Sequence, residues 1–378
     1  MLNWVHKDSP TKRNEKIKFV RHIYNLKNGN HFVRYVNEST HLGIRPIKYL
    51  KQLGILIAEG PAESVALIEQ HPDVEHAEAD VRIHITEPQV ESKILRLQEV
   101  PWGIDRIEAR RVWKRTSGAG VKVAVVDTGI STQHPAFAAN YRGGVNVLSP
   151  MFPPEDYNGH GTHVAGIIGG NALDLGVIGV APSCSLYAVK AFNRKGSANL
   201  SDLLTAINWC IKNKMNIINM SFGMEKLSEA LKQAIQIAYA KGIIMVAATG
   251  NKGLIGHVDF PARYEETIAV TSVSPQDAMS SFSNQGTRMD LAAPGEKILS
   301  AWLNQSRKEM SGTSMAVPHV SGTIALMLSL SSKLSPEEIR SILRRTSQKM
   351  ESLARVGVVN AYQAIRYLEN TKSKSNFR

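Results

Sequence analysis

Residues 121–127 read VKVAVVD, a short, β-branched and almost continuously apolar segment that ends on an acidic residue. Strands buried on both faces of a sheet have this composition. Four later segments share it: LYAVKAF (186–192), NIINMSF (216–222), IIMVAAT (243–249) and TIAVTSV (267–273). Helical patterns separate them, most clearly over residues 200–214 and 227–242. The alternation predicts an α/β fold with a mainly parallel central sheet and helices on both faces.

The segments on either side of this region have other patterns. From Ile17 to Ile85 the order is short strand, strand pair, helix and strand, which predicts a small α+β domain. We therefore expect five parts: a mobile segment 1–16, the small domain 17–85, an exposed linker 86–97, the large domain 98–368 and a polar tail 369–378.

The composition limits the class of protein. Charged residues make up 21% of the chain and hydrophobic residues 43%, which excludes a disordered protein. The formal net charge of +12 raises the question of a nucleic-acid partner. However, the chain has no zinc-finger spacing, no recognition-helix pattern and no interleaving of aromatic and basic residues, so we expect none.

Cysteine usage and hydropathy bear on the compartment. The two cysteines, Cys184 and Cys210, lie in apolar segments and are expected to be free and buried. The amino terminus lacks the apolar region of a signal peptide, and we find no run of about 18 apolar residues. We therefore expect no membrane span and favour a cytoplasmic protein, with a secreted one as the open alternative.

Three motifs carry side chains suited to catalysis. Asp127 ends a predicted buried strand, and ligands of open α/β sheets bind beyond such strand ends. Asp-Thr-Gly after a strand also serves as a turn or a helix cap. His160 lies between two glycines, which let the backbone bend sharply. A zinc site at His160 and His163 lacks both the HExxH spacing and a third ligand, so His163 is interpreted as structural.

The third motif is MSGTSMAVPHVSG, residues 310–322. Ser314 stands at the start of an apolar helical pattern, where free backbone N–H groups and the helix dipole stabilise an oxyanion. Taken alone, it would be an ordinary N-cap serine. Asn251 follows another predicted buried strand, where its side-chain amide is able to serve the same oxyanion.

Together these motifs resemble the subtilisin family over about residues 98–365. Asp-Thr-Gly, His-Gly-Thr-His and Gly-Thr-Ser-Met-Ala occur in the order Asp, His, Ser, which differs from other serine hydrolases. The resemblance implies a serine endopeptidase with Ser314 as nucleophile, His160 as general base and acid, and Asp127 as the residue that orients the imidazole. It also implies an oxyanion hole formed by Asn251 and the backbone N–H of Ser314.

The resemblance further implies where a substrate binds. Ser221-Phe222-Gly223 and Ala248-Thr249-Gly250 match segments that line the cleft, and Lys195-Gly196-Ser197 matches the segment that pairs with substrate as an added strand. Asp259 takes the position at the base of the S1 pocket, where a carboxylate favours Lys or Arg at P1, the residue before the cleaved bond. Lys252 argues against this, because it could reach the pocket rim and neutralise Asp259.

Residues 17–85 resemble the family's prodomain, which assists folding and then inhibits the enzyme by placing its tail in the cleft. The resemblance implies a zymogen that cuts itself within residues 86–97, so that the mature chain starts near Gln98. Lys93 and Arg96 are the candidate cleavage residues.

No metal site is assigned and no cofactor is expected to be required. The family's strong calcium site uses a carboxylate after a His-Pro pair, but here Ala136-Phe137 follow His134-Pro135. Leu173 replaces a second ligand, Gln98 is kept, and Asp174 is a possible substitute. Calcium is therefore not excluded, and a weaker cation site near Ala262, Tyr264 and Asp290 stays open.

Two other functions compete with a protease that acts on proteins and peptides. One is a catalytically silent family member used as a regulatory binding module. The other is an unrelated doubly wound binding protein that matches by chance, which three motifs in order argue against.

Overall fold

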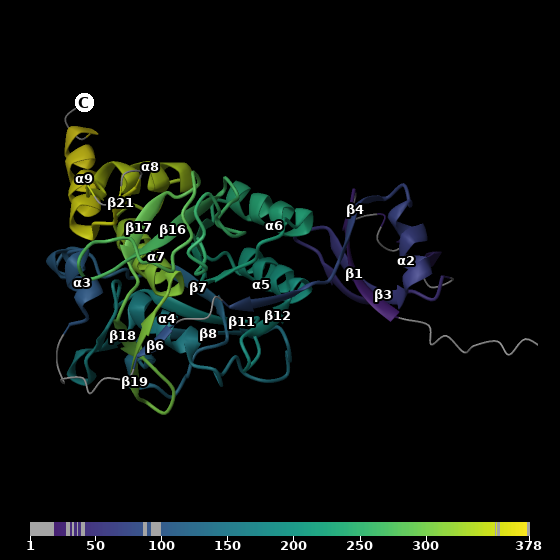
Figure 1. Ribbon diagram of the computed structural model, residues 1–378, viewed down its shortest axis with the longest axis horizontal. Coiled ribbons are helices and arrows are strands. Elements are labelled where there is room, and N and C mark those ends of the chain that lie inside the picture. The colour runs from purple at the N-terminus through teal and green to yellow at the C-terminus, as the bar shows by residue number, and fades with distance from the viewer. Residues whose placement is uncertain are drawn as a thin grey trace, which may run out of the picture. The chain divides into compact units, whose positions relative to one another are not determined.

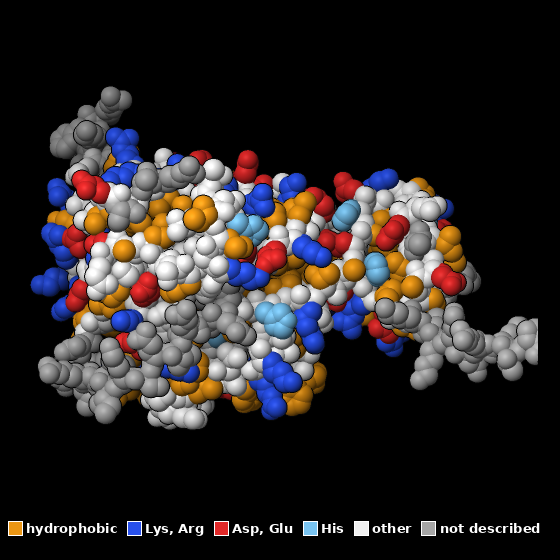
Figure 2. All heavy atoms as spheres, in the orientation of Figure 1, with side chains coloured by type: hydrophobic (Ala, Val, Ile, Leu, Met, Phe, Trp, Pro, Cys, Tyr) orange, Lys and Arg blue, Asp and Glu red, His pale blue; other side chains and the backbone are white. Residues whose placement is uncertain are grey.

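The chain forms two compact units, Met1–Tyr49 with Gly54–Ala79 and Leu50–Leu53 with Asp80–Arg378. Lys, Arg, Asp and Glu side chains are intermixed on the face shown in Figure 2. The computed structural model describes residues 19–27, 31, 34–35, 37–38, 42–85, 89–91, 100–351, 353 and 356–375 (Figure 1).

The smaller unit is a four-stranded sheet of order β2-β3-β1-β4 with helix α2 packed on it. Strand β1 pairs antiparallel with both β3 and β4. Tyr24, Leu56 and Ile68 are at most 2% exposed and form part of its core. Its elements are β1 (Phe19–Leu26), β2 (Arg45–Leu50), β3 (Ile55–Pro61), α2 (Ala62–Glu69) and β4 (Val74–Ala79).

A nine-stranded sheet of order β20-β21-β17-β16-β15-β13-β7-β11-β8 forms the centre of the larger unit. All its pairings are parallel except the one between β20 and β21. This confirms the predicted α/β class. Its strands are β7 (Lys122–Asp127), β8 (Tyr141–Asn146), β11 (Ser185–Lys190), β13 (Ile217–Met220), β15 (Ile244–Ala248), β16 (Thr267–Val273), β17 (Leu291–Pro294), β20 (Gln348–Lys349) and β21 (Gly357–Val358).

Two sets of helices cover the faces of this sheet. Val123 and Val125 pack in one core cluster with residues of α4 and α7, whereas α5 and α6 pack against each other and contact β7 and β15. Ser335 begins α8 with the predicted capping box. The helices are α3 (Trp102–Arg106), α4 (His160–Gly169), α5 (Leu200–Lys212), α6 (Glu229–Ala240), α7 (Thr313–Leu330), α8 (Pro336–Thr346) and α9 (Ala361–Ser375).

Helix α7 runs through the core beside the sheet (Figure 1). Among the described residues it is the one helix whose length and apolar composition would suffice to cross a bilayer, but 89% of it is buried inside the protein. That burial is the pattern of a core helix in a large domain.

Short elements complete the larger unit, and some differ from expectation. The predicted strand 216–222 is split, because β13 ends at Met220 and Phe222 starts a new strand. Residues 369–375, expected in a polar tail, continue α9. The short elements are β5 (Arg82–Ile85), β6 (Gln89–Glu91), η2 (Ala109–Val112), η3 (Pro135–Phe137), β9 (Asn171–Ala172), η4 (Leu173–Leu175), β10 (Val177–Ile178), β12 (Ser197–Asn199), β14 (Phe222–Gly223), β18 (Ile298–Ala301) and β19 (Arg307–Ser311).

Candidate active site

Asp127 is the last residue of β7, in the interior of the large sheet. It is 0% exposed, and its Oδ1 accepts a hydrogen bond of 2.7 Å from the backbone N–H of Thr128. Lys190, at the end of the neighbouring strand β11, lies opposite Asp127 in the register and donates its Nζ to the carbonyl of Thr128. The sheet therefore delivers a buried carboxylate at its carboxyl edge.

His160 is the first residue of α4 and contacts this carboxylate directly. Its Nδ1 lies 2.8 Å from Oδ1 and 2.9 Å from Oδ2 of Asp127, and both side chains are 1% exposed. An ionised carboxylate only accepts hydrogen bonds, so this contact places the ring proton on Nδ1. Gly159 precedes the histidine at φ +103°, and a Cβ there would lie 2.4 Å from the Trp302 ring. The glycine is therefore required for this approach.

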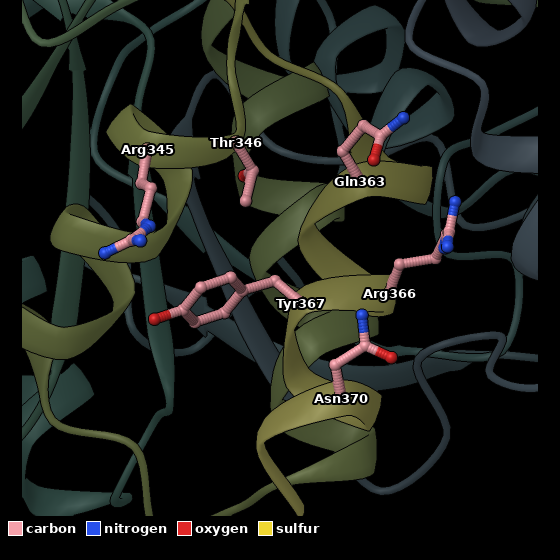
Figure 3. Close-up of a pocket in the computed structure, with 6 residues that line it drawn as sticks. All are labelled: Arg345, Thr346, Gln363, Arg366, Tyr367 and Asn370. Carbon is pink, nitrogen blue, oxygen red and sulfur yellow. The ribbon is translucent and has the colours of Figure 1, made fainter.

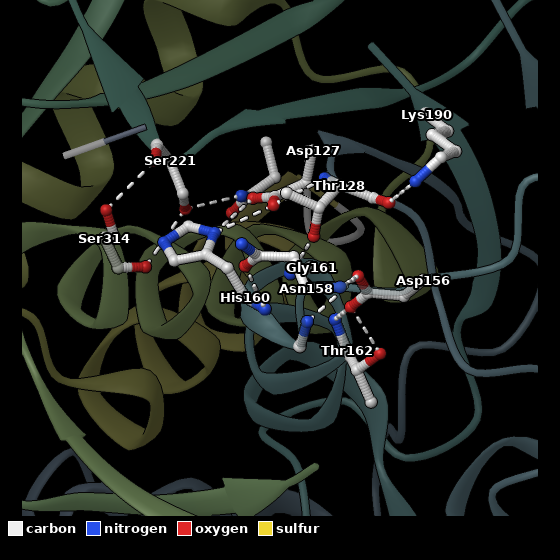
Figure 4. A network of polar contacts seen from close by, with 12 residues as sticks. Asp127, Thr128, Asp156, Asn158, His160, Gly161, Thr162, Lys190, Ser221 and Ser314 are labelled. Carbon is white, nitrogen blue, oxygen red and sulfur yellow. Dashed lines mark hydrogen bonds and ion pairs between the residues drawn. The ribbon is translucent and has the colours of Figure 1, made fainter. Parts of the chain in front are cut away.

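Asp156 holds the start of α4, a role that the sequence analysis missed. Its carboxylate accepts hydrogen bonds from the N–H groups of Asn158, Gly159 and Thr162 and from the Thr162 hydroxyl, at 2.7–3.0 Å. A carboxylate at a helix N-terminus satisfies free donors and complements the dipole. The signal in the sequence is an acidic residue just before the His160 helix, and Figure 4 shows its place beside the pair.

Ser314 lies in the first turn of α7 and is 0% exposed. Its hydroxyl donates to the Ser221 carbonyl at 2.9 Å, and the Ser221 hydroxyl donates to the Ser314 carbonyl at 3.0 Å. In Figure 4 the Ser314 side chain points toward the imidazole of His160. Nε2 of that ring is buried and has no hydrogen-bond partner in the described part of the chain.

Asn251 follows β15 and is tied to the start of the serine helix. Its Oδ1 accepts hydrogen bonds from the Thr313 backbone N–H (2.9 Å) and the Thr313 hydroxyl (2.6 Å). Because Oδ1 is held by the residue before Ser314, the NH₂ end of the amide is directed away from Thr313. The four residues predicted for catalysis therefore come from four separate segments that meet at one edge of the sheet.

A strand of the chain itself, β5, pairs with the segments that were expected to bind substrate. Strand β5 lies between β12 and β14 and is antiparallel to both, with His84 opposite Ser197 and Gly223. The Ile85 N–H also donates to the Gly196 carbonyl at 2.9 Å. Residues 80–85, expected at the end of the small domain, thus belong to the larger unit because their backbone completes this sheet.

Comparison with known proteins identifies this architecture. The chain matches the subtilase family over residues 118–364. It belongs to the subtilase family. An alkaline protease of Shouchella clausii is 36% identical over 340 residues, 89% of this chain and 86% of that protein. Subtilisin Savinase of Lederbergia lenta is 41% identical over 272 residues, 71% of this chain and 100% of that protein.

Subtilisin E of Bacillus subtilis strain 168 is 39% identical over 305 residues, 79% of this chain and 77% of that protein. The chain is therefore a subtilisin-like serine endopeptidase that acts on protein substrates. None of these matches supports the cytoplasmic location that the amino terminus favoured.

Asp259 of this subtilase lies behind two of the predicted cleft segments. A Cβ on Gly250 would lie 2.4 Å from its Oδ2, and a Cβ on Gly223 would lie 2.9 Å from the same atom. Ala248, which ends β15, is fully buried one residue before Thr249, whose carbonyl accepts the Asp259 N–H at 3.0 Å.

Lys252 does not pair with Asp259, although the sequence had suggested that it could reach the pocket rim and neutralise this carboxylate. Its Nζ is paired with Glu225, and the two side chains are 60% and 53% exposed. Asp259 instead contacts His257, whose Nε2 lies 3.0 Å from Oδ1. The sequence analysis missed this histidine, although its i, i+2 spacing from Asp259 in a loop was the available signal.

The sequence left two cation sites open, one near Ala136 and one near Asp290. At the first, Ala136 and Phe137 are buried and apolar and Leu173 and Asp174 lie in η4, while Gln98 is outside the described residues. Within the described residues, no group of three or more His, Cys, Asp or Glu side chains is arranged to hold a metal.

At the second place an arginine supplies the positive charge. Arg288 donates to the carbonyls of Tyr264 (3.2 Å) and Glu265 (2.8 Å), and it lies 3.5 Å from the buried carboxylate of Asp290. Because the guanidinium already contacts oxygens expected of a cation site, these residues do not fit a bound ion.

His163 and the cysteines have structural environments. His163 is fully buried, and its Nε2 lies within 3.0 Å of the carbonyls of Ile298 and Lys308. Burial lowers its pKa to about 3, so it stays neutral. Cys184 and Cys210 are free and buried as predicted, and burial raises the pKa of Cys184 to about 12.

A pocket elsewhere in the larger unit shares no residue with this site. It lies between α8 and α9 (Figure 3), and its lining residues are Arg345, Thr346, Gln363, Arg366, Tyr367 and Asn370.

Proposed function

We propose that this subtilase hydrolyses peptide bonds through an acyl-enzyme on Ser314. The observation that carries the proposal is the orientation of His160. Its Nδ1 is held by both oxygens of Asp127, and its buried Nε2 has no hydrogen-bond partner among the described residues. An imidazole held in this tautomer is prepared to accept a proton at Nε2.

The reaction follows from these positions. The Ser314 hydroxyl turns from the Ser221 carbonyl toward Nε2, which takes its proton as Oγ attacks the substrate carbonyl. The Asn251 amide and the Ser314 backbone N–H stabilise the resulting oxyanion. His160 then gives the proton to the leaving amine, and the C–N bond breaks. Water, deprotonated by the same Nε2, attacks the ester, and the proton returns to Oγ as the acid leaves.

A serine-reactive phosphonate tests this proposal. Mature wild type should form a covalent adduct on Ser314, seen by mass spectrometry, and Ser314→Ala should form none and lose about 10⁴-fold or more in kcat. Ser321→Ala is a matched control, because Ser321 is also buried in α7 but bonds Asn219 at 2.9 Å. Absence of an adduct in folded wild type would instead support the silent binding module.

We further propose that the chain is made as a zymogen and processes itself. Strand β5 supports this, because it pairs with β12 and β14 as a bound peptide would. In this proposal residues 17–85 inhibit the enzyme until cleavage within 86–97, at Lys93 or Arg96. Both of these residues lie outside the described part of the chain.

Processing is tested on the full chain. Wild type should shorten with time to an amino terminus near Gln98, while Ser314→Ala should stay intact; sequencing of the product locates the cut. Ile83 is 3% exposed in β5, so a carboxylate there should weaken the binding of this strand. Ile83→Asp should therefore shorten the lag before activity. Arg82→Ala, an exposed neighbour, is the control. An active enzyme that retains residues 1–97 would refute self-processing.

A further inference from the structure

We propose that Asp259 and His257 together make the P1 selectivity of this enzyme depend on pH, with Lys and Arg preferred in neutral and alkaline solution and the preference fading in acid. The inference rests on the proposed function and concerns the same cleft.

The backbone contacts place the Asp259 carboxylate behind the bound strand. Gly223 is opposite His84 of β5, and Gly223 and Gly250 both lie against Asp259 Oδ2. Met224 and Phe260 exchange two backbone hydrogen bonds of 2.8 Å, which hold the Asp259 segment against the end of β14. A side chain that enters between these two glycine-containing segments therefore meets this carboxylate.

The two oxygens of Asp259 have different environments. Oδ1 accepts hydrogen bonds from His257 Nε2 (3.0 Å) and from Nδ2 of the fully buried Asn284 (3.3 Å). Within the described residues no hydrogen bond reaches Oδ2, the oxygen beside the glycines. Asp259 is 4% exposed, so an incoming ammonium or guanidinium group would find one acceptor oxygen in a site largely shielded from water.

The charged groups around Asp259 act in both directions. Burial raises the pKa of its carboxyl, while His257 and Lys252 lower that pKa and Glu225 raises it. Lys252 and Glu225 are paired with each other at the surface, and the Arg263 guanidinium lies over the Phe260 ring at 5.4 Å. His257 is thus the titratable group in hydrogen-bonding contact with Asp259.

The direction of the pH effect follows from these contacts. Above its raised pKa the carboxyl is charged and attracts a basic P1 side chain; below it the carboxyl is neutral and the attraction is lost. The hydrogen bond from His257 lowers the pKa of the Asp259 carboxyl and so favours its charged form. Removing this hydrogen bond should therefore raise the pKa of Asp259 further and move the loss of basic preference to higher pH.

The test is the ratio of kcat/KM for two peptides that differ only in P1 Arg or P1 Phe, measured on mature enzyme from about pH 5 to 9. A pH effect on the catalytic steps that the two peptides share cancels in the ratio. Wild type should favour Arg by about tenfold or more at high pH and lose that preference in acid. Asp259→Asn should give a flat ratio, and His257→Gln should shift the transition to higher pH.

The outcomes are distinguishable. An active wild type with a flat ratio, or one whose pH-dependent ratio survives in Asp259→Asn, would overturn the inference alone. A wild type that neither cleaves peptide nor forms the Ser314 adduct would overturn the proposed function and this inference together. If Asp259→Asn does not fold, the pH profiles of the wild type and His257→Gln still test whether the P1 preference depends on Asp259 and His257.

Discussion

Two aspartate–histidine pairs in this subtilase have nearly the same contact but different surroundings. Asp127 and His160 are 33 residues apart, come from β7 and α4, and are both 1% exposed. Asp259 and His257 are two residues apart on one loop, and His257 is 26% exposed. The first contact measures 2.8 Å and the second 3.0 Å, so distance alone does not separate them.

The difference lies in what holds each histidine. His160 starts a buried helix that Asp156 caps, and its Nδ1 contacts both oxygens of Asp127, so its Nε2 faces the serine helix. His257 lies on a partly exposed loop, and its Nε2 is used in the contact with Asp259 itself. The first pair is therefore suited to move a proton toward substrate, and the second to set the charge of a carboxylate that substrate meets.

Asparagine at each aspartate should separate the pairs most strongly. Asp127→Asn should lower kcat/KM by about 10⁴-fold for every P1 residue, because it no longer favours the tautomer with its proton on Nδ1. Asp259→Asn should change the P1 ranking with a smaller loss. Steady-state kinetics on P1 Arg and P1 Phe peptides measure both. If Asp127→Asn lost less than about tenfold, the two pairs would not differ as described.

Asn251→Ala tests whether the first pair works with an oxyanion donor. We expect kcat to fall about 10²- to 10³-fold with little change in KM, because the amide acts on the transition state. Thr313→Val is the control: it removes the hydroxyl that holds Asn251 Oδ1 but keeps the backbone donor. It should cost less than about tenfold. Equal losses in the two variants would argue against a direct role for Asn251.

Two histidines that have no carboxylate partner among the described residues, His163 and His319, extend the comparison to acid stability. Burial lowers the pKa of His163 to about 3 and of His319 to about 4, from the ordinary 6.5. Above pH 6.5 both histidines are neutral in the folded and the unfolded chain, so they do not lower the free energy of unfolding there. Below it the unfolded chain takes up the protons first, so each histidine costs about 1.4 kcal/mol of unfolding free energy per pH unit, down to its folded pKa.

Urea unfolding of the inactive Ser314→Ala chain at pH 7 and pH 5 measures this slope. His163→Gln should reduce the slope, and His319→Gln provides an independent second case if the first variant is too unstable. His257→Gln, on the partly exposed loop, should leave most of this slope of unfolding free energy against pH unchanged. An unchanged slope in both core variants would contradict the assignment of neutral buried histidines.

The smallest expected effect is that of chelation. Ala136 and Phe137 are buried and apolar, and Arg288 contacts the Tyr264 carbonyl and the Asp290 carboxylate, so neither place fits a bound cation. We propose that no cofactor is required and expect EDTA to shift the melting temperature by less than about 2 °C, which corresponds to about 1 kcal/mol for a domain of this size. A larger drop would reveal a stabilising metal ion.

Much of the fold was predictable, because its signals are local. Buried parallel strands are short, β-branched and continuously apolar, and residues 121–127 and 267–273 are both strands in the structure. The capping box at Ser335 was predicted for the same reason, since it depends on residues three apart. The break in the strand after Met220 could not be predicted, because the pairing of Phe222 with Ile85 joins segments that are distant in sequence.

The sequence by itself determined the class of sheet, the order of the Asp, His and Ser motifs and the candidate residues, since each depends on residue type and short spacing. Only the tertiary structure decided which side chains are partners. It brought His160 to Asp127, tied Lys252 to Glu225 and His257 to Asp259, and placed β5 between β12 and β14. The physical reason is that a polar side chain bonds the group that packing and burial bring within about 3 Å, and several such groups compete for each one.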